Sequence, residues 1–519
     1  MLDRLFGFKI HDYLQALGLF ILAFGVPMNK VLMSIGTIWL ASNLLLKADF
    51  SNYWKRWKTN PIFWFILSTF VLHVLGLTFT ENLAYAFRDM NTKLPLFVIP
   101  TALIAFPIQK KYIDIILYGF LTSLLMTSII NFWNSTNQSI EDYRDLSLFG
   151  SHIRYSLLVV TGVLIAVYFW IKNRRLWFVY LLLSVWFFYY TLISQVFSGY
   201  IAMGFLLLGF FLYFLQKVKR TSVRRIAGIL FLLFCIVVGK QSYNYVQEST
   251  IKYDFGDLPE RTVYGHLYYH DTTAAWFENG HHVISYIAGD ELRESWAKRS
   301  DVDFDTTFNE KYSLESILIR YMASKGLKKD RDGMLLMTDH DIQNVEKGVP
   351  TILNDYSPIK RRQAKIKNEI LQYLAGGDPD GNSLLQRIEH WKAGASILKN
   401  NWAFGVGTGD VQAAFDYAYE NSTTQLDKEN WNRAHNQFMT FWISFGVFGF
   451  LIFTGFWLWF LWQNIKLNKL IGIGFALIAI ASFLSEDTIE TQQGVTYISL
   501  FLGLCSLMNA SELNKTKEQ

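Results

Sequence analysis

The sequence predicts an all-α membrane protein with about twelve transmembrane helices and one large, mostly helical extracytoplasmic loop between the ninth and tenth helices. Of its 519 residues, 51% are hydrophobic and 17% are aromatic, whereas only 18% are charged. Apolar runs at 14–27, 62–77 and 201–215 are each too long and too apolar for an ordinary amphipathic core helix. A soluble chain of this length would instead divide into several domains joined by polar stretches.

The helices are placed by these apolar runs and by the charged residues between them. The second helix contains polar Ser34, Thr37 and Ser42, and the ninth is short. The expected helices are 13–28, 30–46, 60–78, 93–108, 112–132, 151–171, 176–193, 197–216, 225–239, 440–463, 467–484 and 492–508. Residues 1–239 then hold nine helices, 240–438 form the outer loop, 439–510 hold three helices, and 511–519 form a cytoplasmic tail.

The lysines and arginines of the short loops set the orientation. With both termini in the cytoplasm, basic clusters such as the one at 217–225 lie inside, where positive loops are favoured. The outer short loops then hold only a few basic residues: Lys30, Arg88, Lys93, Arg144 and Arg154. This topology accounts for most of the net charge of +5, so we expect membrane lipids rather than nucleic acid as partners. Cys235 and Cys505 lie in apolar runs and predict neither a disulfide nor a metal site.

The long loop should be folded, because about two hundred residues are too many for a bare connection. Ser357-Pro358 is typical of a helix start, and the helix it opens should end near Gly376-Gly377. Ser383 and Gln386 match a capping box for a helix that reaches about Lys399. We also expect a short helix after Thr338 and another at 315–325. His266, His270, His281 and His282 lack metal-ligand spacing, so no metal site is expected.

Four clusters in the outer segments carry candidate chemistry. Arg387, Trp391 and Gly394 share one face of the capped helix, and alternate glycines at 405–410 allow a close backbone approach. Arg433 and His435 stand just before the tenth helix, where a histidine can accept a proton near neutral pH. The last outer loop holds three carboxylates. Each cluster also has a simpler interpretation: an amphipathic helix, a glycine turn, an interfacial side chain, or charges that merely follow topology.

In this order, the motifs resemble the O-antigen ligase and O-antigen polymerase superfamily of bacteria. The resemblance rests on Arg387-x-x-x-Trp391-Lys-Ala, on Gly-Val-Gly-Thr-Gly-Asp ending at 410, and on His435-Asn-Gln before a helix with Gly446 and Gly449. The overall plan is similar too, with about twelve helices and the longest outer loop between the ninth and tenth. The specific motifs are confined to 387–493.

The resemblance implies a GT-C type glycosyltransferase of the bacterial inner membrane with an undecaprenyl-diphosphate-linked glycan as donor and no metal or other cofactor. It maps the family's essential histidine onto His435 and its outer-loop arginine onto Arg387. A second family arginine is missing, because its motif reads Ser198-Gly199 here, and Arg88 or Arg154 is the expected substitute. The other expected substrate contacts are Arg433, Asn436, Gln437, Trp391, Gly407, Gly409, Asp410, Glu486, Asp487 and Glu490.

The sequence alone does not identify the acceptor of the glycan. A ligase would transfer the glycan to lipid A core and is preferred, a polymerase would extend a lipid-linked glycan, and a third type would glycosylate Ser or Thr of a protein. All would invert the anomeric centre. A different class is a transporter or flippase for lipid-linked sugars, which would place ionisable groups at the membrane midplane. Here the candidate charges lie at the outer helix ends, and His73 is the rare polar group within a helix.

Overall fold

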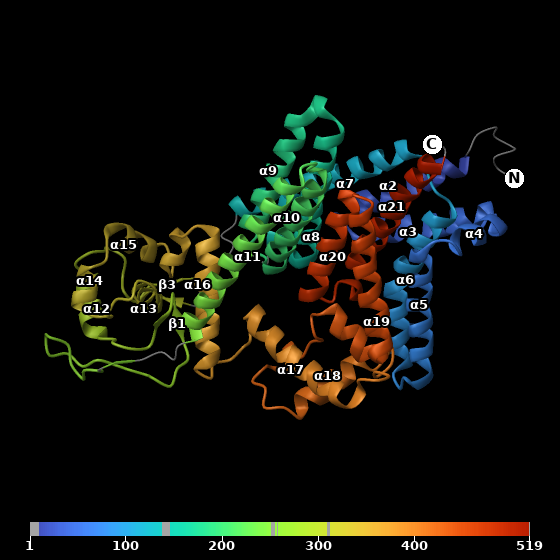
Figure 1. Ribbon diagram of the computed structural model, residues 1–519. Helices are drawn as coiled ribbons and strands as arrows, with labels where there is room; N and C mark the ends of the chain where they lie inside the picture. The colour runs from blue at the N-terminus through green and yellow to red at the C-terminus, as the bar shows by residue number, and fades with distance from the viewer. Residues whose placement is uncertain (1–9, 138–145, 251–254, 257, 309–311, 518–519) are drawn as a thin grey trace. The chain divides into compact units, whose positions relative to one another are not determined.

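The computed structural model describes residues 10–137, 146–250, 255–256, 258–308 and 312–517 of the chain (Figure 1). The protein is 73% helical with almost no sheet, which confirms the all-α prediction. It divides into two compact units, each described here by itself. The first unit comprises Met1–Ala227, His390–Thr423 and Trp431–Gln519, and the second comprises Gly228–Glu389 and Thr424–Asn430.

Each of the twelve predicted ranges is helical over most of its length. Three ends differ notably: α6 begins at Leu83, ten residues earlier than expected, α11 runs on to Thr250, and α21 runs on to Lys517 through most of the predicted tail. The helices are α2 (Ile10–Gly25), α3 (Lys30–Lys47), α5 (Pro61–Gly76), α6 (Leu83–Ala105), α7 (Lys110–Asn137), α8 (His152–Lys172), α9 (Trp177–Ile193), α10 (Phe197–Lys217), α11 (Thr221–Thr250), α19 (Gln437–Lys466), α20 (Leu470–Ser485) and α21 (Gln492–Lys517).

The number of membrane spans is smaller by the criterion of length and apolarity. Among the described residues, seven helical segments are long and apolar enough to cross a membrane, and eight if the bent pair at 30–57 counts as one. Both α2 and α20 have 16 residues, fewer than the ~20 that a bilayer needs, and α6 carries three charges near its start. The chain is a multi-pass membrane protein, but the count of twelve is not confirmed.

The first unit packs its helices around a buried centre. Helix α8 is the most enclosed of the candidate spans, with 72% of its apolar window buried, because α7, α9, α10 and α20 pack against it. Helix α11, which belongs mostly to the second unit, is apolar over 221–245 and long enough to cross a membrane.

A short amphipathic helix, α4 (Phe50–Trp57), turns away from α3 by 118°. Phe50 and Trp54 are exposed, and basic Lys55 and Arg56 follow them. Arg56 Nη1 donates to the Ala105 carbonyl at 2.6 Å and so satisfies a backbone group at the end of α6. Aromatic and basic side chains on one short helix are typical of a segment lying in the membrane interface.

A break at Gly446 divides α19 into two segments. Its φ of 63° is positive, and a Cβ added there would lie 2.0 Å from the Ala403 carbonyl oxygen, so only glycine fits. The loop before α18 (Val411–Glu420) pairs with the backbone around the break: Val406 N donates to Ile443 O at 2.8 Å, and Val447 N donates to Trp402 O at 2.9 Å. The glycine motif thereby satisfies polar groups that a broken membrane helix would leave unpaired.

The second unit contains a small helical core beside two antiparallel strand pairs. The core includes Leu292, Trp296, Leu318 and Met322, all buried. Its elements are β1 (Phe277–Glu278), β2 (His281–His282), α12 (Gly289–Trp296), β3 (Thr307–Phe308), β4 (Tyr312–Ser313), α13 (Leu314–Ser324), α14 (Arg331–Leu335), α15 (Asp339–Glu346) and α16 (Pro358–Leu374).

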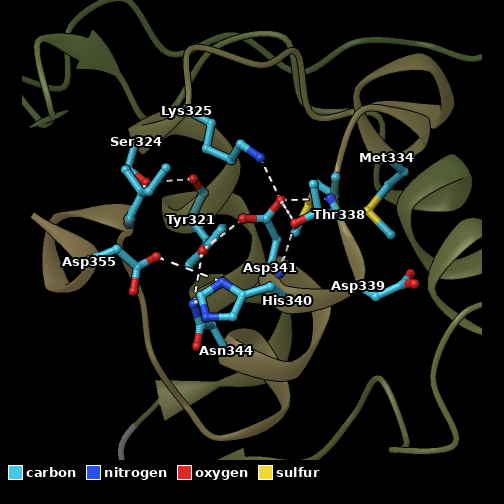
Figure 2. Close-up of polar contacts among 12 residues, drawn as sticks. Tyr321, Ser324, Lys325, Met334, Thr338, Asp339, His340, Asp341, Asn344 and Asp355 are labelled. Carbon is cyan, nitrogen blue, oxygen red and sulfur yellow. Dashed lines mark hydrogen bonds and ion pairs between the residues drawn. The ribbon is translucent and has the colours of Figure 1, made fainter.

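The predicted loop helices are confirmed. Thr338 caps α15 through a capping box with Asp341, and Asp341 also binds Tyr321 and Lys325 (Figure 2). Helix α13 matches the expected helix at 315–325, and α16 starts with Pro358 as expected. Helix α17 (Ser383–Asn401) begins at Ser383 itself, one residue earlier than the predicted capping box implies.

Candidate functional site

His435 lies at the start of α19, held by two carboxylates from the loop between α20 and α21. Its Nδ1 is 3.2 Å from Glu486 Oε2, and its backbone N donates to Asp487 Oδ2 at 3.0 Å. Because the Glu486 carboxylate accepts, Nδ1 carries the proton of the neutral ring and Nε2 carries the lone pair. The Glu486 side chain is 1% exposed, whereas that of His435 is 32% exposed. A buried carboxylate therefore orients an accessible imidazole.

The backbone of His435 is strained, with a φ of 46°. Non-glycine residues adopt this conformation at a cost, and they cluster where surrounding contacts hold a functional group in place. Asp487 supplies such contacts, since its other oxygen accepts from Thr440 Oγ1 at 2.6 Å. Burial raises the pKa of Asp487 above its ordinary value.

The two residues after His435 fasten α19 to the same loop. The Asn436 side chain caps α19 by accepting from Met439 N at 3.1 Å. Buried Gln437 donates to Glu490 Oε1 at 2.9 Å and accepts from Ile489 N at 2.9 Å. These contacts give both amides a positioning role, and a direct contact with substrate stays a prediction.

Glu490 is the centre of a charged network beside this loop. Lys93 Nζ is 3.0 Å from Glu490 and 2.7 Å from Asp89, while Arg433 Nη1 is 2.9 Å from Glu490. Arg433 also bonds the Tyr85 hydroxyl and lies over its ring. Burial alone would raise the pKa of Glu490, but the Lys93 ammonium and the Arg433 guanidinium outweigh it and hold that pKa well below its usual range. Glu490 is therefore ionised and joins α6 to the start of α19.

A second histidine lies next to the first. The rings of His390, in α17, and His435 have centroids 5.2 Å apart and are tilted by 41°. The Tyr419 hydroxyl donates to the Asn432 carbonyl at 2.8 Å, so His390 Nδ1, 2.7 Å away, is the donor to that hydroxyl. His390 is 1% exposed and supports the imidazole of His435 from the side.

Arg154, on α8, reaches the same loop. Its Nη2 is 3.9 Å from Glu486, and its Nη1 donates to Ser151 Oγ at 3.2 Å. Gly199 corresponds to the glycine that follows the arginine in the family motif. A Cβ added at Gly199 would lie 3.0 Å from Cβ of Ser156, which is on α8 like Arg154. Arg154 thus extends from the helix that packs against the position of the missing arginine. Arg88 is exposed on α6.

The glycine motif contacts the chain itself. A Cβ at Gly407 would meet Thr80 at 2.5 Å, and one at Gly409 would meet the Asn82 carbonyl at 2.2 Å. Asp410 accepts from the backbone N–H groups of Glu81 and Asn82, at 2.8 and 2.9 Å, and so holds the turn just before α6, whose N-cap is Asn82. The motif positions α5, α6 and α19, and these contacts explain it without a substrate.

The remaining predicted residues lie on α17. Trp391 is 39% exposed in the first unit. Arg387 belongs to the second unit, is 8% exposed and donates from Nη1 to the Ser383 carbonyl at 2.9 Å. The structure thus brings seven predicted residues together: His435, Arg433, Gln437, Asp487, Glu486, Glu490 and Arg154. Arg387 lies in the second unit and is not among them.

One acidic cluster in the second unit was not found by the sequence analysis, which assessed histidines and cysteines as metal ligands. Among the described residues, carboxylate oxygens of Asp378, Asp380 and Asp427 lie within 4.8 Å of one another, close enough to hold a cation. Asp380 already accepts from Asp427 N and from the Asn430 amide, both at 2.8 Å. Of the four histidines assessed as metal ligands, His282 hydrogen-bonds to the Ala274 carbonyl.

Asp89, Lys93 and His390 were also missed as site residues. Lys93 was expected at the membrane edge of a helix, because the predicted start of that helix fell ten residues too late. The i, i+4 spacing of Asp89 and Lys93 is a weak ion-pair signal that would have extended the predicted helix to an earlier start. His390 stands within the Arg387–Gly394 motif, yet nothing in its spacing pairs it with His435.

The apolar helices define a multi-pass membrane protein, in which a carboxylate-bound histidine stands just before the broken helix α19. Comparison with known families agrees: the O-antigen ligase family model matches residues 348–454, which include the glycine motif, His435 and the Gly446 break. This segment is thus similar to an O-antigen ligase-like family, which implies a glycosyltransferase-like membrane enzyme in general terms. No curated protein matches it significantly.

Proposed function

We propose that this protein transfers a glycan from an undecaprenyl-diphosphate carrier to an acceptor hydroxyl at the outer face of the bacterial inner membrane. The observation that carries the proposal is the 3.2 Å contact between His435 Nδ1, within the segment matched by the family, and buried Glu486, beyond that segment. Such a carboxylate fixes the tautomer and stabilises the imidazolium that forms when Nε2 takes a proton.

In the proposed step, an oxygen–carbon bond forms between the acceptor hydroxyl and the anomeric carbon. His435 Nε2 takes the hydroxyl proton, and the bond from that carbon to the diphosphate oxygen breaks, so its electron pair leaves with the diphosphate. Attack opposite the leaving group inverts the anomeric centre. Arg154 is the proposed partner of the departing diphosphate, because guanidinium groups bind phosphate oxygens with two parallel hydrogen bonds and need no metal. The resemblance implies the same role for Arg387 of the second unit, which stays a separate prediction.

Lipid A core is our proposed acceptor, which makes the protein a ligase. The direct test is incubation of the purified protein with a lipid-diphosphate glycan and, separately, with lipid A core, a lipid-linked glycan and a serine-containing protein. We expect glycan to appear on lipid A core. Product only on the lipid-linked glycan or the protein would replace the ligase with a polymerase or a protein-glycosylating enzyme. No transfer to any acceptor, with the donor intact, would contradict the proposal.

A further inference from the structure

A cavity of about 180 Å³ lies at the end of the first unit opposite His435. It is bounded by the last residues of α8, α10 and α19, by Cys505 and Met508 within α21, and by the first residues of α7 and α20. Asn464, which lines it, follows His435 along almost the whole of α19, about 40 Å at 1.5 Å per residue. The cavity is therefore separate from the proposed transfer site.

The charge of this cavity is positive. Its lining includes three lysines, Lys110, Lys172 and Lys469, and one carboxylate, Asp114. Asp114 already binds Lys172, with oxygens 2.5 and 2.6 Å from Nζ. One carboxylate against three ammonium groups leaves two positive charges. Burial and the nearby Lys110 ammonium lower the pKa of Lys469, which lies in the loop between α19 and α20. An anion between Lys110 and Lys469 would relieve this repulsion.

The rest of the lining fits an amphiphile. Asn468 has a left-handed backbone, with a φ of 52°, and its Oδ1 is buried without a hydrogen-bond partner among the described residues. This acceptor is available to a hydroxyl of a ligand. Apolar Ile113, Leu470 and Met508 line the cavity beside these polar groups. Basic pockets between membrane helices, with apolar walls, are suited to anionic lipid head groups.

We propose that this cavity binds the phosphate group of an anionic molecule, with Lys110 and Lys469 as its charge partners and Asn468 as acceptor for a neighbouring hydroxyl. A phospholipid with a glycerol head group has all the required parts: a phosphate, hydroxyls and an apolar chain. A soluble phosphate ester shares the phosphate chemistry and is separated by the test.

The full-length protein in nanodiscs, examined by native mass spectrometry, tests the proposal. We expect retention of phosphatidylglycerol over phosphatidylcholine, and about tenfold weaker retention in the double variant Lys110→Gln/Lys469→Gln. The matched control is Lys55→Gln/Lys58→Gln, two exposed lysines of the α4 region outside the cavity, which should behave as the wild type. The variant Lys110→Arg/Lys469→Arg keeps both charges and should retain the lipid, which separates charge loss from misfolding.

A second arm identifies the source of the phosphate. Glycerol 1-phosphate and inorganic phosphate are added to the lipid-bound protein. If either displaces the lipid in the wild type and binds the double variant about tenfold more weakly, the site is supported and a soluble anion is a ligand. If neither competes, the lipid is the ligand. Equal retention of both lipids would overturn the proposal, because it would show no preference for an anionic head group. An equal loss in both glutamine double variants would also overturn it, because general attraction to basic surfaces would then explain the retention.

Discussion

At the residue scale, the arrangement around His435 resembles a base held by its neighbours rather than a solvent-exposed side chain. Glu486 fixes one ring nitrogen, Asp487 holds the backbone, and His390 supports the ring face. Three independent restraints on one imidazole limit its motion, which is what a positioned proton acceptor requires.

We predict that His435→Gln inserts and folds but loses transfer by a factor on the order of a hundred to ten thousand, the usual contribution of a general base. Glutamine matches the polarity and reach of histidine but accepts no proton. Initial rates across a pH series check this, and the wild type should lose activity on the acid side as the imidazole becomes protonated. A wild-type rate in His435→Gln, with no acid limb in the wild-type profile, would leave His435 with an anchoring role only.

Glu486→Gln tests the positioning carboxylate. The amide keeps the size but removes the charge that stabilises the imidazolium, so we expect about a tenfold to hundredfold loss of kcat. The acid limb of the pH profile should also move to lower pH, because the protonated ring has lost its anionic partner. A lower rate with an unmoved acid limb would mean that Glu486 acts only on folding.

Arg154→Gln should weaken donor binding. Loss of a charged hydrogen bond to a phosphate oxygen corresponds to about a tenfold to hundredfold rise in KM for the donor, with a smaller change in kcat. Arg88→Gln is the comparison, since Arg88 is exposed and has a smaller expected effect. Steady-state rates at varied donor concentration distinguish them. A larger effect of Arg88→Gln would assign the missing arginine's role to α6.

At the element scale, the Gly446 break is the feature that determines the shape of α19. The glycine loop at 402–407 pairs with the backbone on both sides of the break, so two stretches of the chain depend on one positive φ. The end of α5 and the start of α6 are held by the following residues of the same loop, Thr408 and Asp410.

Gly446→Ala should therefore lower the stability of the first unit by at least 1–3 kcal/mol, the approximate cost of an unfavourable backbone conformation, with the clash at Ala403 in addition. The matched control is Gly455→Ala on the same helix, where an added Cβ meets nothing within 4 Å. Thermal unfolding in detergent measures both. Equal unfolding temperatures for the two variants would show that α19 tolerates a straight path.

How far the sequence predicts the elements depends on their chemistry. Apolar runs place all twelve helices, because long hydrophobic segments have few alternatives to a helix in lipid. The start of α6 was missed, because Asp89 and Lys93 look like loop residues until Glu490, from a distant segment, neutralises Lys93. The motif singles out His435, whose role stays a prediction, whereas His390 and Lys93 depend on contacts that only the folded chain creates.

At the scale of the whole molecule, the orientation of the bundle decides what the site can reach. The Lys and Arg distribution predicts both termini inside, which places His435 at the outer surface. A reporter active only outside the cytoplasm should be active when fused after residue 300 and silent when fused after residue 220. The reverse pattern would move the proposed transfer reaction to the cytoplasmic face and exclude lipid A core as its acceptor.

The contacts around His435 and Glu490 limit how this centre can be inherited by gene exchange. The segment matched by the O-antigen ligase family ends at residue 454, yet the carboxylates that hold its histidine and its arginine stand at 486–490, and the lysine that pairs with Glu490 stands at 93. A gene exchange limited to that segment would deliver the histidine without its orienting acid. Recombination between relatives can therefore preserve this centre only when all three stretches are exchanged together or are already compatible. The segment shared with the family does not carry the complete centre by itself.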